Sequence, residues 1–209
     1  MNEFWTPEPI WRGECCYLLG GGSSLRAVDL SILRGRRILT INSSLGRAVD
    51  AGLDDGVLFF TDSDWFVPRK EVIARWRGLV VTTSRSAKAE MPKVRRVQSE
   101  LKPAFPALGA PVIRKGRSSG HTAVGLAVAL GAARVVLLGY DMRVVDGRSH
   151  HHDDYRAGDR LVYEVSFIPA FNGWNAAALK VGVQILNASV GSALREFPMA
   201  DLNEVLRGA

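Results

Sequence analysis

The chain has 209 residues, 47% of them hydrophobic, and carries a formal charge of +6 with a sequence pI near 9.7. This length suits one domain with a full core, and the sequence contains neither an apolar run of membrane-spanning length nor a secretory leader, so we expect a cytoplasmic protein. The positive charge favours anionic partners, nucleotides first, and allows DNA or RNA.

The first predicted strand, residues 14–19, leads into a glycine-rich turn from Gly20 to Ser24. Glycines let a ligand approach the backbone, and a helix that begins near Ser24 would offer free N–H groups to a phosphate. The spacing matches neither a Walker loop nor the dinucleotide fingerprint. We expect a phosphate-binding turn here, with a plain strand-to-helix turn as the alternative.

The second and third predicted strands, residues 36–41 and 57–60, also end in polar residues. Asn42 follows the second strand, where its amide suits a base, ribose or phosphate; the alternative is that it caps a helix over residues 45–51. Asp62 and Asp64 follow the third strand. In an extended segment they would face the same way and could hold Mg²⁺ or a ribose, whereas a helix cap is the simpler alternative.

A fourth strand is predicted over residues 78–83. The basic segment over 84–111 is expected to be irregular or to form extra short strands; it is either a solvated face or a contact for an anionic acceptor. A helix that begins at Ser119 and stops at Gly131 has apolar residues on much of its surface. The uniformly apolar strand 135–138 then ends in Gly139-Tyr140-Asp141. Because open α/β sheets bind ligands at the carboxyl ends of their strands, we expect the functional site here.

A histidine-rich loop follows a predicted hairpin over residues 143–148. Its members are His150, His151 and His152. Neutral imidazoles serve as general bases or metal ligands. Consecutive histidines cannot all face one ion, so a general base is the preferred interpretation, no metal site is assigned, and a His-rich surface loop is the alternative. The remaining elements are a helix over 163–180, a strand over 182–186 and a helix over 200–206.

Strands that alternate with helices predict an α/β fold, a single Rossmann-like three-layer domain with a mostly parallel sheet, over residues 1–209. Polar residues follow each strand end. The sheet should therefore gather them along one edge.

The chain resembles the superfamily that joins bacterial lipooligosaccharide sialyltransferases with 6-hydroxymethylpterin diphosphokinase-like proteins of archaea, bacteria and phages. The motifs that carry the resemblance are Leu18 to Leu25 for a "GxGPSL" turn, with serine at position 23 where the family usually has proline, then Ile41-Asn42, Ser119-Gly120, and Leu137 to Met142. The resemblance implies that the glycine turn and Asn42 hold the nucleotide, that Asp141 marks its pocket, and that a histidine after the strand takes the acceptor's proton.

These observations lead to a nucleotide-dependent group transferase as the preferred hypothesis, with a nucleotide sugar as donor and an acceptor hydroxyl on a glycan or on hydroxymethylated phage DNA. The alternatives are an ATP-dependent diphosphokinase that requires Mg²⁺, with metal roles for Asp62, Asp64 and Asp141, and a nucleotide-binding module without turnover. The candidate catalytic residues are His150, His151, His152 and Asp141. The candidate nucleotide-binding residues are Gly20, Gly21, Gly22, Ser23, Ser24, Asn42, Asp62, Ser119, Gly120, Gly139 and Tyr140.

Overall fold

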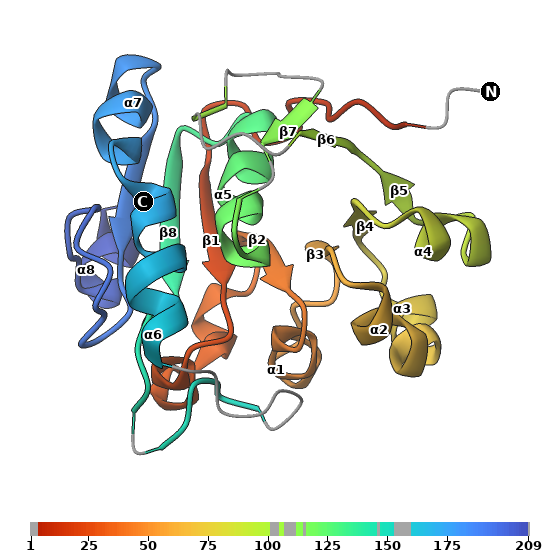
Figure 1. Ribbon diagram of the computed structural model, residues 1–209, viewed down its shortest axis with the longest axis horizontal. Helices are drawn as coiled ribbons and strands as arrows, with labels where there is room; N and C mark the ends of the chain where they lie inside the picture. Colours follow the sequence, from red (N-terminus) through yellow and green to blue (C-terminus); the bar gives the residue numbers. More distant parts are fainter. Residues whose placement is uncertain are drawn as a thin grey trace.

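The computed structural model describes residues 4–100, 105–106, 112–114, 116–145, 147–152 and 160–208. Its main element is a seven-stranded sheet in the order β5-β4-β3-β2-β1-β8-β9, with parallel pairing throughout (Figure 1). The strands are β1 (Cys15–Leu19), β2 (Arg37–Ile41), β3 (Val57–Phe60), β4 (Leu79–Thr82), β5 (Arg95–Arg96), β8 (Arg134–Leu138) and β9 (Gln184–Asn187). A separate parallel pair joins β6 (Gln98–Glu100) to β7 (Val112–Arg114).

Both faces of the sheet are covered by helices, because successive side chains of each buried strand point to opposite faces. In β1, Cys16 and Leu18 pack in one core with α5 (Ser119–Ala129) and α7 (Trp174–Lys180), while Tyr17 and Leu19 pack in the other. The helices that contribute to this second core are α1 (Ser44–Asp50), α2 (Ser63–Phe66), α3 (Lys70–Arg75), α4 (Arg85–Glu90) and α8 (Leu202–Arg207). The layout is α/β with a parallel sheet between two helical layers, as expected for a Rossmann-like domain.

Helix α5 is the most buried helix and lies across β1 and β2 in Figure 1. All of its residues from His121 to Ala129 are buried, so it has no polar face. Because α5 precedes β8 and runs against the strand direction, its first turn lies at the carboxyl edge of the sheet. The fold thus brings one helix N-terminus to the edge where the strand-end residues gather.

The predicted strands and α5 are confirmed with shifts of a few residues at their ends, but two regions differ. The helix predicted over 163–180 is broken into α6 (Arg160–Val162), the π-helical turn η4 (Tyr163–Phe167), the 3-10 turn η5 (Pro169–Phe171) and α7. The cause is Pro169, which lacks the amide hydrogen a continuous helix needs, followed by Gly173 at φ 78°. The segment 84–111 starts with the short helix α4, capped by Ser84, which was not predicted, and then contains the short strands β5 and β6, which agree with the short-strand alternative. Part of that segment lies outside the described residues.

The order of the strands places a topological switch at the centre of the sheet. β1 pairs with β2 on one side and with the much later β8 on the other. Connections leave this point in opposite directions, which opens a crevice at the carboxyl ends of the two strands. Among the described residues, no helix is long and apolar enough to cross a membrane.

Candidate functional site

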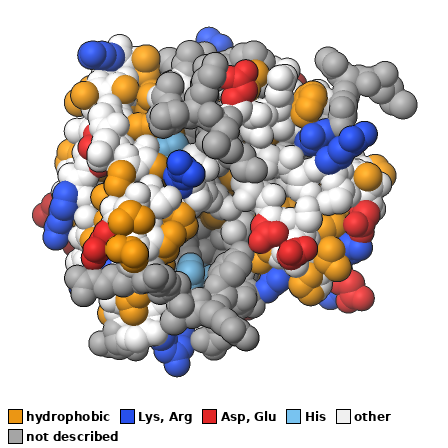
Figure 2. Space-filling model, viewed as in Figure 1, with side chains coloured by type: hydrophobic (Ala, Val, Ile, Leu, Met, Phe, Trp, Pro, Cys, Tyr) orange, Lys and Arg blue, Asp and Glu red, His pale blue; other side chains and the backbone are white. Residues whose placement is uncertain are grey.

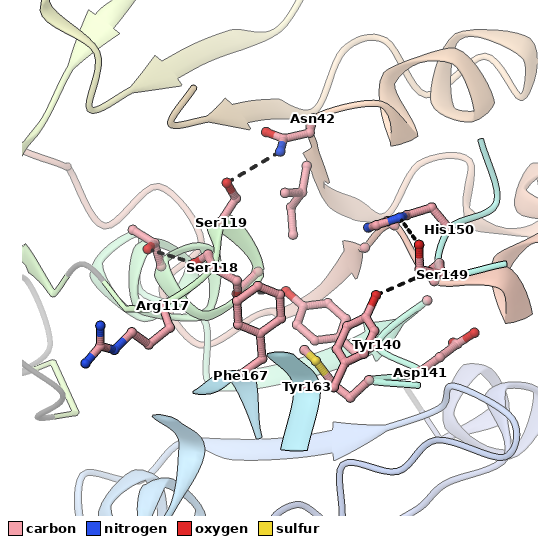
Figure 3. A pocket seen from close by; sticks show the side chains of 18 of the residues that line it. Asn42, Arg117, Ser118, Ser119, Tyr140, Asp141, Ser149, His150, Tyr163 and Phe167 are labelled. Carbon is pink, nitrogen blue, oxygen red and sulfur yellow. Dashed lines mark hydrogen bonds between the residues drawn. The ribbon is translucent and has the colours of Figure 1, made fainter. Parts of the chain in front are cut away.

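A cavity of about 450 Å³ lies at the switch point, above the carboxyl ends of β1, β2, β3 and β8. Its volume is in the range of small-molecule sites. Figure 3 shows its lining from close by, and Figure 2 shows histidine side chains at the hollowed part of the same face. The predicted residues that line it are Gly20, Gly21, Gly22, Asn42, Asp62, Ser119, Gly120, Gly139, Tyr140, Asp141, His150 and His152. The sheet therefore brings together most of the predicted site.

The glycines after β1 have a structural role, because they allow the chain segments that follow β1 and β8 to lie in direct contact. A Cβ atom on Gly20 would lie 2.7 Å from the carbonyl oxygen of Gly139, and one on Gly22 would lie 2.5 Å from Oδ1 of Asp141. The amide of Gly22 donates to the Gly139 carbonyl at 2.7 Å. Any side chain at position 20 or 22 would separate the two strand ends.

Two amides of the glycine turn remain available to a ligand. The N–H groups of Gly21 and Ser23 have no acceptor among the described residues, whereas the N–H of Ser24 donates to Asp141 at 2.7 Å. The turn continues into the 3-10 helix η1 (Ser23–Ala27) rather than into an α-helix. A phosphate could therefore bind to the Gly21 side of the turn. The predicted helix near Ser24 is only a short 3-10 helix, and the Ser24 amide already donates to Asp141.

The first turn of α5 forms the opposite wall of the cavity. Ser118 is its N-cap, with Oγ accepting from the amide of His121 at 3.2 Å, and the amides of Ser119 and Gly120 have no acceptor among the described residues. Ser119 Oγ lies 2.8 Å from Thr61 Oγ1, which ties the helix to the end of β3. This N-terminus, with its partial positive charge and the guanidinium of Arg117 beside it (Figure 3), suits an anion.

Asn42 and Asp62 come from neighbouring strand ends and differ in their roles. The Asn42 side chain does not cap α1; its amide donates to Ser119 Oγ at 3.4 Å. Asp62 does cap α2, with its carboxylate accepting from the amide of Asp64 at 2.9 Å, while it also lines the cavity. The prediction that Asp62 and Asp64 share an extended segment was wrong, because α2 begins at Ser63.

Two cavity residues hold an unfavourable backbone conformation. Asn42 and Met142 have φ angles of 48° and 50°, and they are the non-glycine residues with positive φ in the described part of the chain. Such conformations cost about 1–3 kcal/mol and gather at functional sites. Their occurrence after β2 and after β8 agrees with a binding site at this edge of the sheet.

An aromatic wall closes the cavity on the side of η4. Tyr163 and Phe167 lie close to Tyr140 in Figure 3, and the Tyr163 and Phe167 rings meet edge to face at 5.6 Å. Tyr140 donates its hydroxyl to the carbonyl of Gly120 at 3.0 Å, which fixes the ring beside α5. The sequence placed Tyr163 and Phe167 only within the helix predicted over 163–180, so their cavity position was missed. Single-turn π-helices are frequent at functional sites, but no sequence pattern marks them.

The three histidines of the predicted catalytic loop occupy different environments. His150 and His152 line the cavity, and the ring of His150 lies against Gly21, where a Cβ would be 2.9 Å from its Cδ2. Ser149 Oγ contacts Nδ1 of His150 at 2.9 Å and so orients this ring (Figure 3). Burial lowers the pKa of His150, and the charge of Asp141 opposes that shift. His150 is therefore oriented and mostly neutral near pH 7.

His151 faces away from the cavity lining into the protein. Ser44 Oγ donates its proton to the carbonyl of Gly20 at 2.6 Å. Nε2 of His151 lies 3.1 Å from Ser44 Oγ and therefore acts as the donor to this hydroxyl oxygen. Burial lowers the pKa of His151 to about 4, helped by the nearby cations. The backbone of His151 also donates to Gly21 at 2.8 Å and accepts from Arg26. These contacts give His151 the position of an anchor for the loop.

Asp141 joins the end of β8 to the glycine turn. Its carboxylate is 2% exposed and accepts from both the amide and the hydroxyl of Ser24. In Figure 3 it points away from the aromatic wall. Ser23 donates its hydroxyl to the loop carbonyls of Arg148 or His150. Ser23, Ser24 and Asp141 thus hold the turn and the histidine loop in place, and the Ser23 and Ser24 side chains do not line the cavity.

In the described part of the chain, no three His, Cys, Asp or Glu side chains converge in a way that could hold a metal ion. The comparisons with known proteins are also negative: a scan of protein-family models found no match, and neither the curated proteins nor the solved structures gave a significant similarity. The superfamily resemblance therefore stays a prediction that rests on the motifs themselves.

Proposed function

We propose that this protein is a nucleotide-dependent group transferase that takes a glycosyl group from a nucleotide sugar and passes it to an acceptor hydroxyl. The observation that supports it best is the pair of amide-presenting turns across one cavity: Gly21 after β1, and Ser119 and Gly120 at the start of α5. Together with Arg117 they offer N–H donors and positive charge from two sides, which suits a diphosphate.

The same groups would stabilise the departing nucleotide. As the acceptor oxygen forms its bond to the anomeric carbon, the bond from that carbon to the phosphate oxygen breaks, and negative charge collects on the phosphate. Preformed N–H donors at that position stabilise the charge without reorganisation. The aromatic wall of Tyr140, Tyr163 and Phe167 offers flat surfaces for a base or a sugar ring.

His150 is the histidine we assign as the base. A general base needs a lone pair, a pKa below the working pH and a partner that fixes its orientation. Burial supplies the lowered pKa, and Ser149 supplies the orientation at Nδ1. When Nδ1–H donates to Ser149, Nε2 carries the lone pair that takes the acceptor's proton.

The first experiment is a calorimetric titration with CDP, UDP, ADP and the corresponding nucleotide sugars, with EDTA or with Mg²⁺. We then expect nucleotide release from the sugar donor that binds. His150→Asn should lower the rate by about 10² or more and leave nucleotide affinity within about twofold. His152→Asn, which changes the neighbouring cavity histidine in the same way, is the matched control with a mild effect.

The pH profile adds a second readout. Burial lowers the pKa of His150 below its usual 6.5. The reaction rate should therefore stay constant above pH 6.5 and fall only when the pH drops below 6.5. If His150→Asn and wild type share one profile and one rate, His150 is not the base. If instead ATP binds with Mg²⁺ and AMP is formed in a chelator-sensitive reaction, the diphosphokinase alternative replaces glycosyl transfer.

A further inference from the structure

The chain segment that follows β9 belongs to a buried network of polar side chains. We call residues 188–194 the serine turn, because Ser189 and Ser192 lie in it; Asn187, at the end of β9, completes the network. These three side chains are at most 1% exposed. All residues of the serine turn are described, and none of them lines the main cavity. Buried polar groups cost free energy unless they are hydrogen-bonded, so their partners show what the network holds.

The two serine hydroxyls hold the backbone of Tyr140 at both of its polar groups. Ser189 Oγ accepts from the amide of Tyr140 at 2.8 Å, and the Ser192 hydroxyl donates to the carbonyl of Tyr140 at 2.6 Å. The amide of Ala193 donates to the carbonyl of Asp141 at 2.7 Å. The ladder between β8 and β9 ends before Tyr140. The hydroxyls of the serine turn therefore take the place of strand pairing for the segment after β8.

The network also fixes the two serines themselves. Asn187 donates through Nδ2 to Ser192 Oγ at 3.0 Å, and its Oδ1 accepts from the amide of Ser189 at 3.0 Å. Ser192 Oγ further accepts from the amide of Leu194 at 3.0 Å, so its own proton is left for the carbonyl of Tyr140. Buried networks whose members are bonded to one another are rigid. The serine turn is thus a firm support for the segment after β8.

Tyr140 and Asp141 connect this support to both amide-presenting turns of the cavity. The Tyr140 hydroxyl donates to the carbonyl of Gly120, in the first turn of α5, at 3.0 Å. The Asp141 carboxylate accepts from the amide and the hydroxyl of Ser24, at the end of the glycine turn. The two side chains point in different directions in Figure 3. The segment that the serine turn holds is therefore the one that bridges the two turns.

We propose that Ser189 and Ser192 are positioning residues of the nucleotide site: through Tyr140 and Asp141 they set the places of the two amide-presenting turns. Such support matters because a shift of about 1 Å in a positioned group costs about 10²-fold in rate, and preformed N–H donors act only where the charge develops. The word nucleotide rests on the proposed function. The positioning itself is tested in the protein without a ligand.

The first experiment measures amide hydrogen exchange by NMR in the full chain. Ser189→Ala and Ser192→Ala each remove one hydroxyl that holds the segment after β8. Both should raise the exchange rates of the Ser24 amide, in the glycine turn, and of the Thr122 amide, in the first turn of α5, by about tenfold, as expected for the loss of one buried hydrogen bond. Tyr140→Phe keeps both serines and removes only the link to α5, so it should speed exchange at Thr122 and not at Ser24.

Thr82→Val is the matched control. The Thr82 hydroxyl is also buried at a strand end, where it donates to the carbonyl of Phe60 at 2.8 Å and accepts from the amide of Ser84 at 3.0 Å. This variant loses a similar pair of hydrogen bonds at the end of β4, but it should leave the exchange at Ser24 and Thr122 within about twofold of wild type. Equal acceleration in the control and in the serine variants overturns the positioning role.

The second experiment is a calorimetric titration of the same variants with CDP, UDP and ADP. Ser189→Ala and Ser192→Ala should weaken the nucleotide that binds wild type by about tenfold, and Thr82→Val by no more than about twofold. Wild-type affinity in both serine variants overturns their role at the nucleotide site. If none of the three nucleotides binds wild type, the proposed function fails, and the exchange rates still decide whether the serines position the two turns.

Discussion

At the scale of single residues, the structure gives Asp141 a different role from the one that the sequence predicted. The sequence placed this carboxylate in the nucleotide pocket, and it does line the cavity, yet both of its oxygens accept hydrogen bonds from Ser24. A buried carboxylate with two donors from one residue stabilises the turn between β1 and η1. Its main role in the free protein is therefore to position the amides of the glycine turn.

Asp141→Asn should lower the free energy of unfolding by about 1–3 kcal/mol, because an amide has one acceptor oxygen and its NH₂ group would face a Ser24 donor. Urea denaturation followed by circular dichroism measures this. Ser24→Ala and the double variant complete a double-mutant cycle, and the two changes should be strongly non-additive. Additive effects would show that the Asp141 carboxylate does not act through Ser24.

At the scale of elements, the first turn of α5 combines a stability role with the proposed binding role. Ser118 caps the helix, and the next two residues present their amides to the cavity. Thr61 and Asn42 hold Ser119 from two strand ends, so the helix start is fixed relative to the sheet. Substitutions of Ser118 can therefore distinguish an effect on the stability of the fold from an effect on phosphate binding.

Ser118→Ala should lower the free energy of unfolding by about 1 kcal/mol, as expected for the loss of an N-cap side chain. Ser118→Asp keeps a capping oxygen and should retain the stability of wild type. Its added negative charge, however, lies beside the amides that we propose to bind phosphate, and nucleotide affinity should fall by about tenfold. Thermal melts and calorimetry with the best-binding nucleotide measure the two effects. Wild-type affinity in Ser118→Asp would place the phosphates elsewhere in the cavity.

At the scale of the whole molecule, two buried histidines on opposite sides of the sheet link stability to pH. His121 packs against Trp174 with ring centroids 3.9 Å apart. Its Nε2 lies 2.8 Å from the carbonyl oxygen of Ala170, which can only accept, so Nε2 is protonated and donates. The buried Nδ1 of this ring has no hydrogen-bond partner in the described part of the chain. Burial lowers the pKa of His121, like that of His151, to about 4.

Since both histidines titrate near 6.5 when unfolded, the unfolded chain binds more protons than the folded protein between pH 6.5 and about 4. Their stability contribution is fully present above pH 6.5 and is lost as the pH falls to about 4, by up to about 3 kcal/mol for each histidine. Chemical denaturation at a series of pH values should show this slope. His121→Phe keeps the aromatic packing and removes the titrating group, so its slope should be smaller; an unchanged slope would show that His121 does not contribute.

The sequence by itself determined the strands, the central buried helix and the set of polar strand ends, because those signals are local. Apolar runs such as Val135 to Leu138 are typical of a sheet covered on both faces, and the helix predicted to begin at Ser119 and to stop at Gly131 is α5. Given a parallel sheet, the meeting of Gly20, Asn42 and Tyr140 at one edge follows from the direction of the strands.

Tertiary structure decided which of these residues face the cavity. His150 and His151 are neighbours in sequence, but the fold turns one toward the cavity and the other toward Ser44, and only packing distinguishes them. The same holds for Tyr163 and Phe167, which line the cavity together with Tyr140 although they come from the π-helical turn η4, far along the chain. These placements depend on contacts between residues far apart in the chain, and no local pattern records such contacts.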